Sequence, residues 1–135
     1  MKELEGMLEA FKEAKIVYLT TYFDESNRSR QMTNFNESPY EIMWFPTEDG
    51  SRKILDLSRN PKVLVTFPGS KKGEFYEIEG KAELASQKEV DEKWRWWYLY
   101  WHPEQSDRFW FPRGMKNHKR AIINIYPISA KLIRK

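Results

Sequence analysis

The sequence predicts a mainly β fold with flanking helices, in which six short antiparallel strands form a closed or partly closed barrel. Two observations support this prediction. Short runs of β-branched and aromatic residues recur along the chain, and most links between them are of hairpin length. A length of 135 residues fits one domain, which we expect to span residues 1–135.

The first half of the chain contains one helical pattern followed by three strand patterns. Residues 3–14 carry apolar side chains three and four positions apart, as in an amphipathic helix. The polar segment 24–28 separates the first strand from the second, and the composition of residues 37–39 indicates a turn. We expect a helix at 3–14 and strands at 16–23, 29–36 and 40–46.

The second half places two further helices between the remaining strands. Asn60 and Pro61 end the first of them. Ser86 and Glu89 have the spacing of a capping box, in which each side chain satisfies a free backbone donor of the other. In the last strand, Pro127 indicates a bend or an edge. We expect helices at 52–59 and 86–101, an irregular segment at 103–120, and strands at 62–67, 74–84 and 121–133.

The composition is rich in aromatic residues and has no cysteine. Six Trp, seven Tyr and eight Phe are many for a domain with so small an interior, so either the core itself is unusually aromatic or a subunit interface or a flat ligand uses some of these rings. The lack of cysteine excludes disulfides, thiolate zinc sites and a thiol nucleophile. We expect no metal site.

Charge and hydropathy indicate a cytoplasmic protein that binds neither membrane nor nucleic acid. The net charge of +3 is only mildly basic, and the sequence shows no strongly basic stripe. No stretch approaches the roughly 20 apolar residues that span a bilayer. The N-terminal segment alternates charged and apolar residues, unlike a signal peptide.

A candidate anion site lies between the third strand and the short helix. Ser51 would cap the helix, Arg52 and Lys53 follow it, and Thr47 stands across the loop. A helix start presents free backbone donors, and these side chains suit a phosphate dianion. The same pattern also fits an ordinary cap followed by two solvated charges.

Two arginines on the second strand supply a second basic group. Arg28 and Arg30 lie two positions apart, so their side chains project from the same face of the strand. If that face is buried, the arginines need an anionic partner, because an unpaired buried charge is costly. If it faces solvent, they need none.

An ordered series of motifs resembles the pyridoxamine 5'-phosphate oxidase-related flavin-binding family, in its general-stress-protein branch. The resemblance covers nearly the whole chain. The motifs are Ser29-Arg30-Gln31-Met32, Trp44-Phe45-Pro46-Thr47, Ser51-Arg52-Lys53, Asn60-Pro61-Lys62-Val63, the strand 79–84, the Trp-rich helix predicted at 86–101 and Phe109-Trp110-Phe111-Pro112.

The resemblance implies a split β-barrel homodimer that binds FMN at the subunit interface. It implies that Arg30, Ser51, Arg52 and Lys53 contact the phosphate and ribityl oxygens. Gln31, Met32 and Thr33 would run beside the ring, and Gln31 stands where members of the family commonly have proline. Thr47 and the backbone near Pro46 would close the phosphate side, and Trp110 would reach the partner's flavin.

Several functions fit this resemblance. The first is a flavin-dependent oxidoreductase acting on an unknown small molecule, with no catalytic residue assigned. The second is a stress protein that binds or stores flavin without turnover. A barrel that binds the deazaflavin F420, haem or no cofactor is a third, and in the haem case His102 or His118 would be the iron ligand.

Overall fold

The computed structural model describes residues 1–23, 26–48, 52–93 and 120–134. A further short helix covers residues 87–93. The labelled elements are α1 (Met7–Glu13), β1 (Ile16–Phe23), β2 (Ser26–Thr33), β3 (Met43–Glu48), α2 (Arg52–Arg59), β4 (Lys62–Pro68), β5 (Glu74–Leu84) and β6 (Arg120–Arg134).

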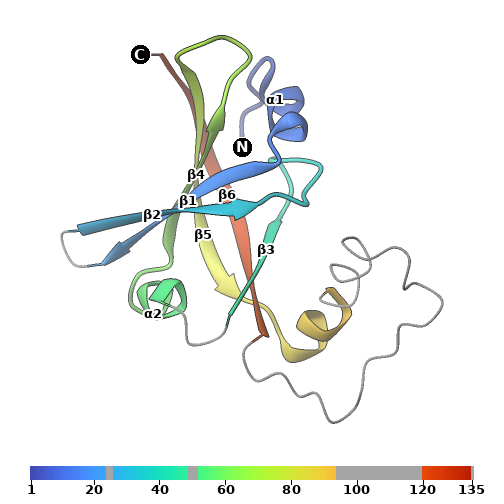
Figure 1. Ribbon diagram of the computed structural model, residues 1–135, viewed down its shortest axis with the longest axis vertical. Coiled ribbons are helices and arrows are strands. Elements are labelled where there is room, and N and C mark those ends of the chain that lie inside the picture. Colours follow the sequence, from blue (N-terminus) through green and yellow to red (C-terminus); the bar gives the residue numbers. More distant parts are fainter. Residues whose placement is uncertain (24–25, 49–51, 94–119, 135) are drawn as a thin grey trace.

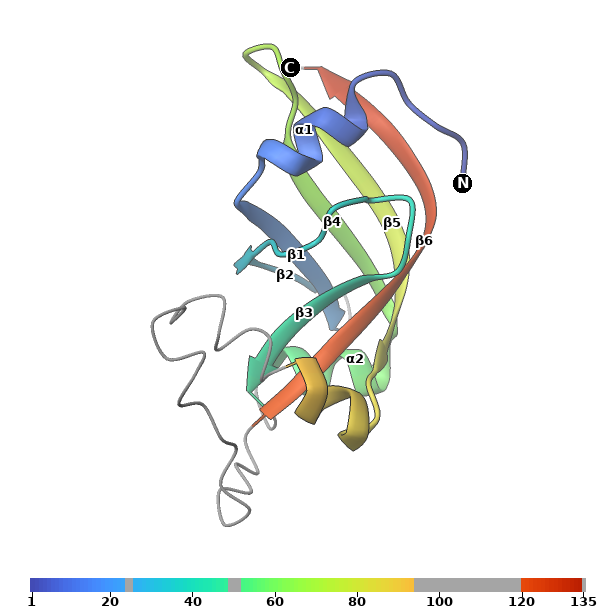
Figure 2. The ribbon, with the colours of Figure 1, turned by 90° about the vertical axis from the view of Figure 1, so that its right-hand side faces the viewer.

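The six strands form one antiparallel sheet in the order β2-β1-β4-β5-β6-β3. The sheet curls into a half-barrel, with α1 across one end and α2 at the other (Figures 1 and 2). β6 is long enough to pair with all of β5 and with all of β3. The predicted mainly β split barrel is therefore confirmed, and β2 and β3 are its two edge strands.

A bulge between β5 and β6 helps to bend the sheet. Glu79 pairs with Ser129 and Gly80 with Pro127, so Ile128 is the extra residue. A Cβ on Gly80 would lie 2.7 Å from Ile125 Cγ2, so the two strands need glycine here to approach closely. The register shift lies beside Pro127, where the sequence indicated a bend or an edge.

The core fills the concave face of the curled sheet. At the α1 end, Phe67 packs between Phe11 and Tyr76, with ring centroids 5.2 Å and 5.6 Å apart. β4 alternates buried and exposed side chains along its length, as expected of a strand with one face on the core. Apolar side chains of α2, chiefly Ile54 and Leu57, are buried in the same cluster.

Three of the predicted segments differ from the observed elements by three or more residues at one end or both, whereas β4 and β6 extend only one residue beyond their predicted limits. The first helix begins at Met7 rather than at residue 3, because Gly6 takes a left-handed conformation with φ 79°. β2 spans 26–33 rather than 29–36. The side chain of Asn34 instead donates to the carbonyls of Phe11 and Ala14 at the end of α1.

β3 spans 43–48 rather than the predicted 40–46. Tyr40 lies outside the sheet, where its hydroxyl accepts a hydrogen bond from the Leu4 N–H and donates one to the Leu4 carbonyl. Asn36 contacts the β3 edge, because its side chain bonds both the N–H and the carbonyl of Trp44. Side-chain hydrogen bonds thus shifted both strand boundaries in this region.

The last predicted helix is described only over residues 87–93, and its remainder lies outside the described residues. The predicted cap is half confirmed, since Ser86 Oγ accepts a hydrogen bond from the Glu89 N–H. The carboxylate of Glu89 instead accepts hydrogen bonds from Asn124 and Lys93. Within the described part of the chain, no helix is both long and apolar enough to span a bilayer.

Candidate site at the open edges of the barrel

The predicted site residues gather on the two edge strands and the helix that follows one of them. Arg30, Gln31, Met32 and Thr33 lie on β2, and Pro46 and Thr47 lie on β3. Lys53 is in the first turn of α2, just after β3. An edge strand leaves half of its backbone donors and acceptors without a strand partner, so both edges can bond a ligand through the main chain.

The side chains of the predicted β2 residues divide between the two faces of the sheet. Met32 is opposite Val17 in the register and is buried in the core. Gln31 and Thr33 are exposed on the other face, where Gln31 donates a hydrogen bond of 3.3 Å to the Tyr18 hydroxyl. Gln31, Met32 and Thr33 therefore do not present one continuous side-chain surface.

The two arginines of β2 lie on the concave face, where they meet a buried carboxylate. Asp56 of α2 is only 1% exposed. Its Oδ1 lies 3.7 Å from Arg28 Nη1, and its Oδ2 accepts a 2.9 Å hydrogen bond from the Thr21 hydroxyl. Arg30 Nη1 in turn donates to Thr21 Oγ1 at 3.4 Å. The same-face prediction for Arg28 and Arg30 is confirmed, and Asp56 is an anionic partner of the half-buried Arg28.

Asp56 and Thr21 are absent from the predicted site, although one sequence signal points to Asp56. In the sequence it stands between Leu55 and Leu57, and a charged residue that is buried in such surroundings needs a specific partner. Together with the arginine pair on β2, that placement suggests an ion pair. Thr21 gives no such signal, because threonine is common in strands.

Thr47 carries a buried hydroxyl without a partner. The residue is 7% exposed on the concave face of β3, and among the described residues its Oγ1 has no hydrogen-bond partner. Leaving such a group unpaired costs about 1–3 kcal/mol, so it suits a site where a ligand supplies the missing bond. Thr47 therefore fits the role that the family resemblance gave it beside a phosphate.

The remaining predicted residues are only partly described. Lys53 is half-buried at the start of α2, which is consistent with an anion contact. Arg52 begins α2, but its side chain lies outside the described part of the structure, as do Ser51 and Trp110. The same holds for His102 and His118, the candidate haem ligands.

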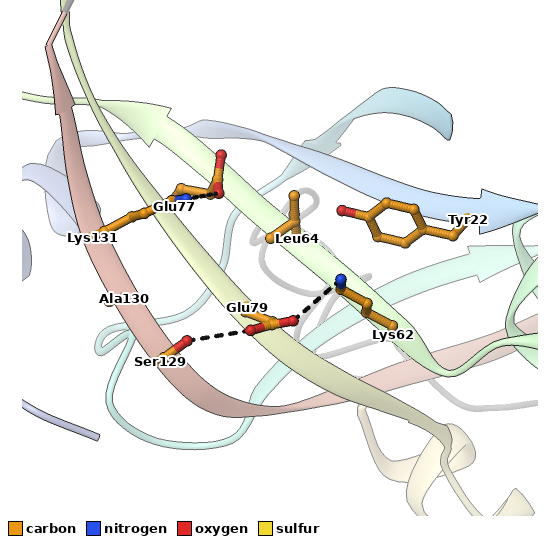
Figure 3. Close-up of a pocket in the computed structure, with 8 residues that line it drawn as sticks. All are labelled: Tyr22, Lys62, Leu64, Glu77, Glu79, Ser129, Ala130 and Lys131. Carbon is orange, nitrogen blue, oxygen red and sulfur yellow. Dashed lines mark hydrogen bonds and ion pairs between the residues drawn. The ribbon is translucent and has the colours of Figure 1, made fainter. Parts of the chain in front are cut away.

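The opposite face of the sheet contains a hollow of about 340 Å³, which Figure 3 shows. Its charges are paired within it, because Lys62 lies 3.4 Å from Glu79 and Lys131 lies 3.4 Å from Glu77. Partial burial raises the pKa of Tyr22, whose ring lies 5.1 Å from Lys62 Nζ. Because each of these lysines is paired with a glutamate, the hollow attracts a phosphate only weakly.

A second polar cluster fixes helix 87–93 to the convex face of β3 and β6. Asn124 Nδ2 donates to Glu89 at 2.8 Å, and Lys93 Nζ lies 3.2 Å from Glu89 and 5.1 Å from the Trp44 ring centroid. The hydrogen bond from Asn124 holds the pKa of the Glu89 carboxyl below its usual range, with help from Lys93. Among the described residues, no cluster of three or more His, Cys, Asp or Glu side chains is placed to hold a metal ion.

The structure is thus a six-stranded split barrel. Basic and hydrogen-bonding side chains lie on its two edge strands, β2 and β3, and at the start of α2. The chain belongs to the pyridoxamine 5'-phosphate oxidase-like family, whose model matches residues 2–132. No curated protein sequence matches the chain.

Solved structures share this fold at low sequence identity. General stress protein 26 of Bacillus anthracis has a TM-score of 0.66 and 20% identity, with 97% of each chain covered. The general stress FMN/FAD binding protein of Xanthomonas citri has a TM-score of 0.65 and 20% identity, covering 94% of this chain and 84% of that one. A FAD-binding protein of Mesorhizobium loti has a TM-score of 0.68 and 16% identity, covering 98% and 94%.

Proposed function

We propose that this protein binds FMN at the open edges of its split barrel. The observation that carries the proposal is the buried hydroxyl of Thr47, which has no hydrogen-bond partner among the described residues. Thr47 lies on the strand that leads into the helix bearing Arg52 and Lys53. Its family membership supports the choice of a flavin, as do fold neighbours named for binding FMN or FAD.

The phosphate would be held between β2, the end of β3 and the start of α2. Arg30 from β2, Thr47 from β3, and Ser51, Arg52 and Lys53 at the helix start would supply charged and neutral donors. Hydrogen bonds that involve a charged group are stronger than those between neutral groups, and a phosphate dianion needs several donors that converge on it. The first turn of α2 adds free backbone N–H groups and a partial positive charge.

The flavin ring would lie along the edge of β2. Gln31 and Thr33 expose their side chains there, whereas Met32 points into the core and would contribute only its backbone. The backbone near Pro46 would border the phosphate side from β3. Trp110 of a second copy would cover the ring, as the resemblance implies.

A homodimer is part of this proposal. The sheet exposes apolar side chains on β1 and β6, namely Ile16, Tyr18, Tyr126 and Ile128. Exposed apolar surface of this kind is typical of a protein interface. We also expect the aromatic residues of segment 94–111, which lies outside the described residues, to contribute. A sedimentation mass near 16.3 kDa, that of one chain, would contradict the dimer.

An oxidoreductase is the activity that we propose, in the cytoplasm and on a small molecule. When bound, a flavin supplies the hydride or electron transfer, and the protein contributes binding, orientation and electrostatics. The site residues proposed above would hold the cofactor and shield one side of it. Storage of flavin without turnover remains the alternative, and loss of the flavin colour on adding reduced nicotinamide would decide against it.

The test of the phosphate site is a pair of double variants. Arg52→Ala with Lys53→Ala should weaken FMN binding by about 3–6 kcal/mol, because each charge-assisted contact contributes about 1.5–3 kcal/mol. Riboflavin lacks the phosphate, so its affinity should stay the same.

The matched control removes two positive charges elsewhere. Lys62→Ala with Lys131→Ala changes the net charge equally, on the convex face. It should leave FMN binding nearly unchanged. Equal loss in both double variants would mean that net charge alone attracts FMN, and no loss in the first would place the phosphate elsewhere. The visible spectrum of the purified protein distinguishes flavin from haem or F420.

A further inference from the structure

We infer that Thr21 is a positioning residue for phosphate recognition, acting together with Asp56 by holding Arg30 and α2 in the geometry that the ligand needs. This inference rests on the proposed FMN site. Thr21 is fully buried at the centre of β1 and is not among the residues proposed to touch the ligand. Its effect would therefore pass through the groups that it bonds.

The direction of the hydrogen bonds at Thr21 follows from the chemistry of its neighbours. A carboxylate can only accept, so the Thr21 hydroxyl must donate its proton to Asp56 Oδ2, 2.9 Å away. The lone pairs of Oγ1 then face Arg30 Nη1 at 3.4 Å. One hydroxyl thus serves as donor and acceptor at once, and it connects the carboxylate to the arginine.

This connection joins three elements of the proposed site. Asp56 belongs to the same helix as Arg52 and Lys53, Thr21 lies on β1, and Arg30 lies on the edge strand β2. Among the described strands, β2 has β1 as its only neighbour, so side-chain bonds to α2 add a restraint that strand pairing does not provide. Thr21 and Asp56 therefore fix the helix start relative to the arginine.

Fixing Arg30 before the ligand arrives should favour binding of a phosphate in particular. An arginine side chain that is mobile before binding loses rotamer freedom when the ligand orders it. An arginine that hydrogen bonds already hold in place has lost that freedom before the ligand binds, so binding costs less. In the proposed site, Arg30 contacts the phosphate and not the flavin ring. The contribution of Thr21 should consequently appear in the affinity for FMN and be missing from the affinity for riboflavin.

The experiment replaces Thr21 with valine, which keeps the shape and the β-branch but removes the hydroxyl. Loss of one hydrogen bond to a charged group corresponds to about a tenfold weaker affinity for FMN. Riboflavin affinity should not change. Thr21→Ser retains the hydroxyl and should keep the wild-type ratio of FMN to riboflavin affinity. Thr20→Val makes the same substitution on the opposite face of β1 and should also keep that ratio.

Each outcome bears on one of the two proposals. If the wild-type protein binds FMN no better than riboflavin, the proposed phosphate site fails, and the role of Thr21 fails with it. If the wild type prefers FMN and Thr21→Val prefers it equally, only the positioning role is overturned. Equal weakening of both ligands would mean that Thr21 is purely structural. Should the valine variant not fold, Thr21→Ala is compared with Thr21→Ser in the same way.

Discussion

The two ends of the barrel are built from different kinds of interaction. At the α1 end the interior is aromatic, and its polar groups are satisfied, as when the Tyr76 hydroxyl donates to the Glu5 carbonyl at 2.8 Å. Burial, with nearby carboxylates, raises the pKa of Tyr76, so this hydroxyl remains a donor at neutral pH. At the α2 end the interior contains the carboxylate of Asp56 and the hydroxyl of Thr47, which has no hydrogen-bond partner in the described part of the chain.

This difference separates stability from binding along one sheet. Apolar packing contributes free energy of folding, whereas buried polar groups cost it unless they are paired. The α2 end therefore gives up stability, and proteins commonly do so where a ligand binds. Substitutions at the α1 end should change the free energy of unfolding, and those at the α2 end should change ligand affinity.

The largest expected effect is at the α1 end. Phe67→Ala would leave a cavity beside Phe11 and Tyr76, which costs about 3–5 kcal/mol of unfolding free energy. Urea denaturation measures this loss. The fraction that stays folded should bind FMN as the wild type does, because Phe67 lies far along β4 from α2.

Phe67→Leu is the control for that substitution. It removes the ring but fills more of the space, so its loss of stability should be clearly smaller. If Phe67→Ala also abolished FMN binding in folded protein, the two ends would be coupled. Stability at the α1 end and ligand affinity at the α2 end would then not be separate properties.

A smaller effect is expected from Glu89, whose cluster lies outside the barrel. Its folded pKa is held below the ordinary 4.5, chiefly by Asn124, so the ionised form stabilises the fold above that value. This contribution is lost as the pH falls through the folded pKa. Glu89→Gln should therefore lower the unfolding temperature at neutral pH, and the difference from wild type should shrink below about pH 4.5.

Glu92→Gln provides the matched control on the same helix, because Glu92 is exposed. It should leave the unfolding temperature nearly unchanged at any pH, as is usual for a surface charge. A pH-independent difference for Glu89→Gln would show that the charge of this carboxylate does not stabilise the attachment of helix 87–93 to β6.

The sequence predicted most of the fold because its strands carry strong local patterns. β1, β5 and α2 have the boundaries that composition and periodicity gave them. β2 and β3 were each misplaced by three residues at the N-terminal end. Their limits depend on Asn34 and Asn36, which bond to α1 and to Trp44. No local pattern encodes such long-range contacts.

The candidate site was less predictable for the same reason. Motifs located the basic groups on β2 and α2, and the family resemblance related them to one ligand. The Thr21–Asp56 pair escaped prediction because its two members are 35 positions apart, and only folding brings them together. Likewise, the unpaired state of the Thr47 hydroxyl depends on what surrounds it in three dimensions.

The smallest effect on stability, and the clearest test of the comparison between the two ends, is expected for Thr47→Val. Valine has nearly the same shape and removes a buried hydroxyl that has no partner among the described residues. Without ligand, the free energy of unfolding should therefore stay the same or rise by up to about 1–3 kcal/mol, since an unpaired polar group is removed. Thermal denaturation without flavin measures this change.

The same substitution should have the opposite effect on ligand binding. A hydroxyl that completes its hydrogen bonding on a phosphate contributes to affinity, so Thr47→Val should bind FMN several-fold to about thirtyfold more weakly. Thr47→Ser keeps the hydroxyl and should bind FMN nearly as the wild type does. A protein that is more stable when empty and weaker in binding would show that the α2 end gives up stability for its ligand. A valine variant that is less stable when empty would mean that Thr47 serves the fold, as Phe67 does at the other end.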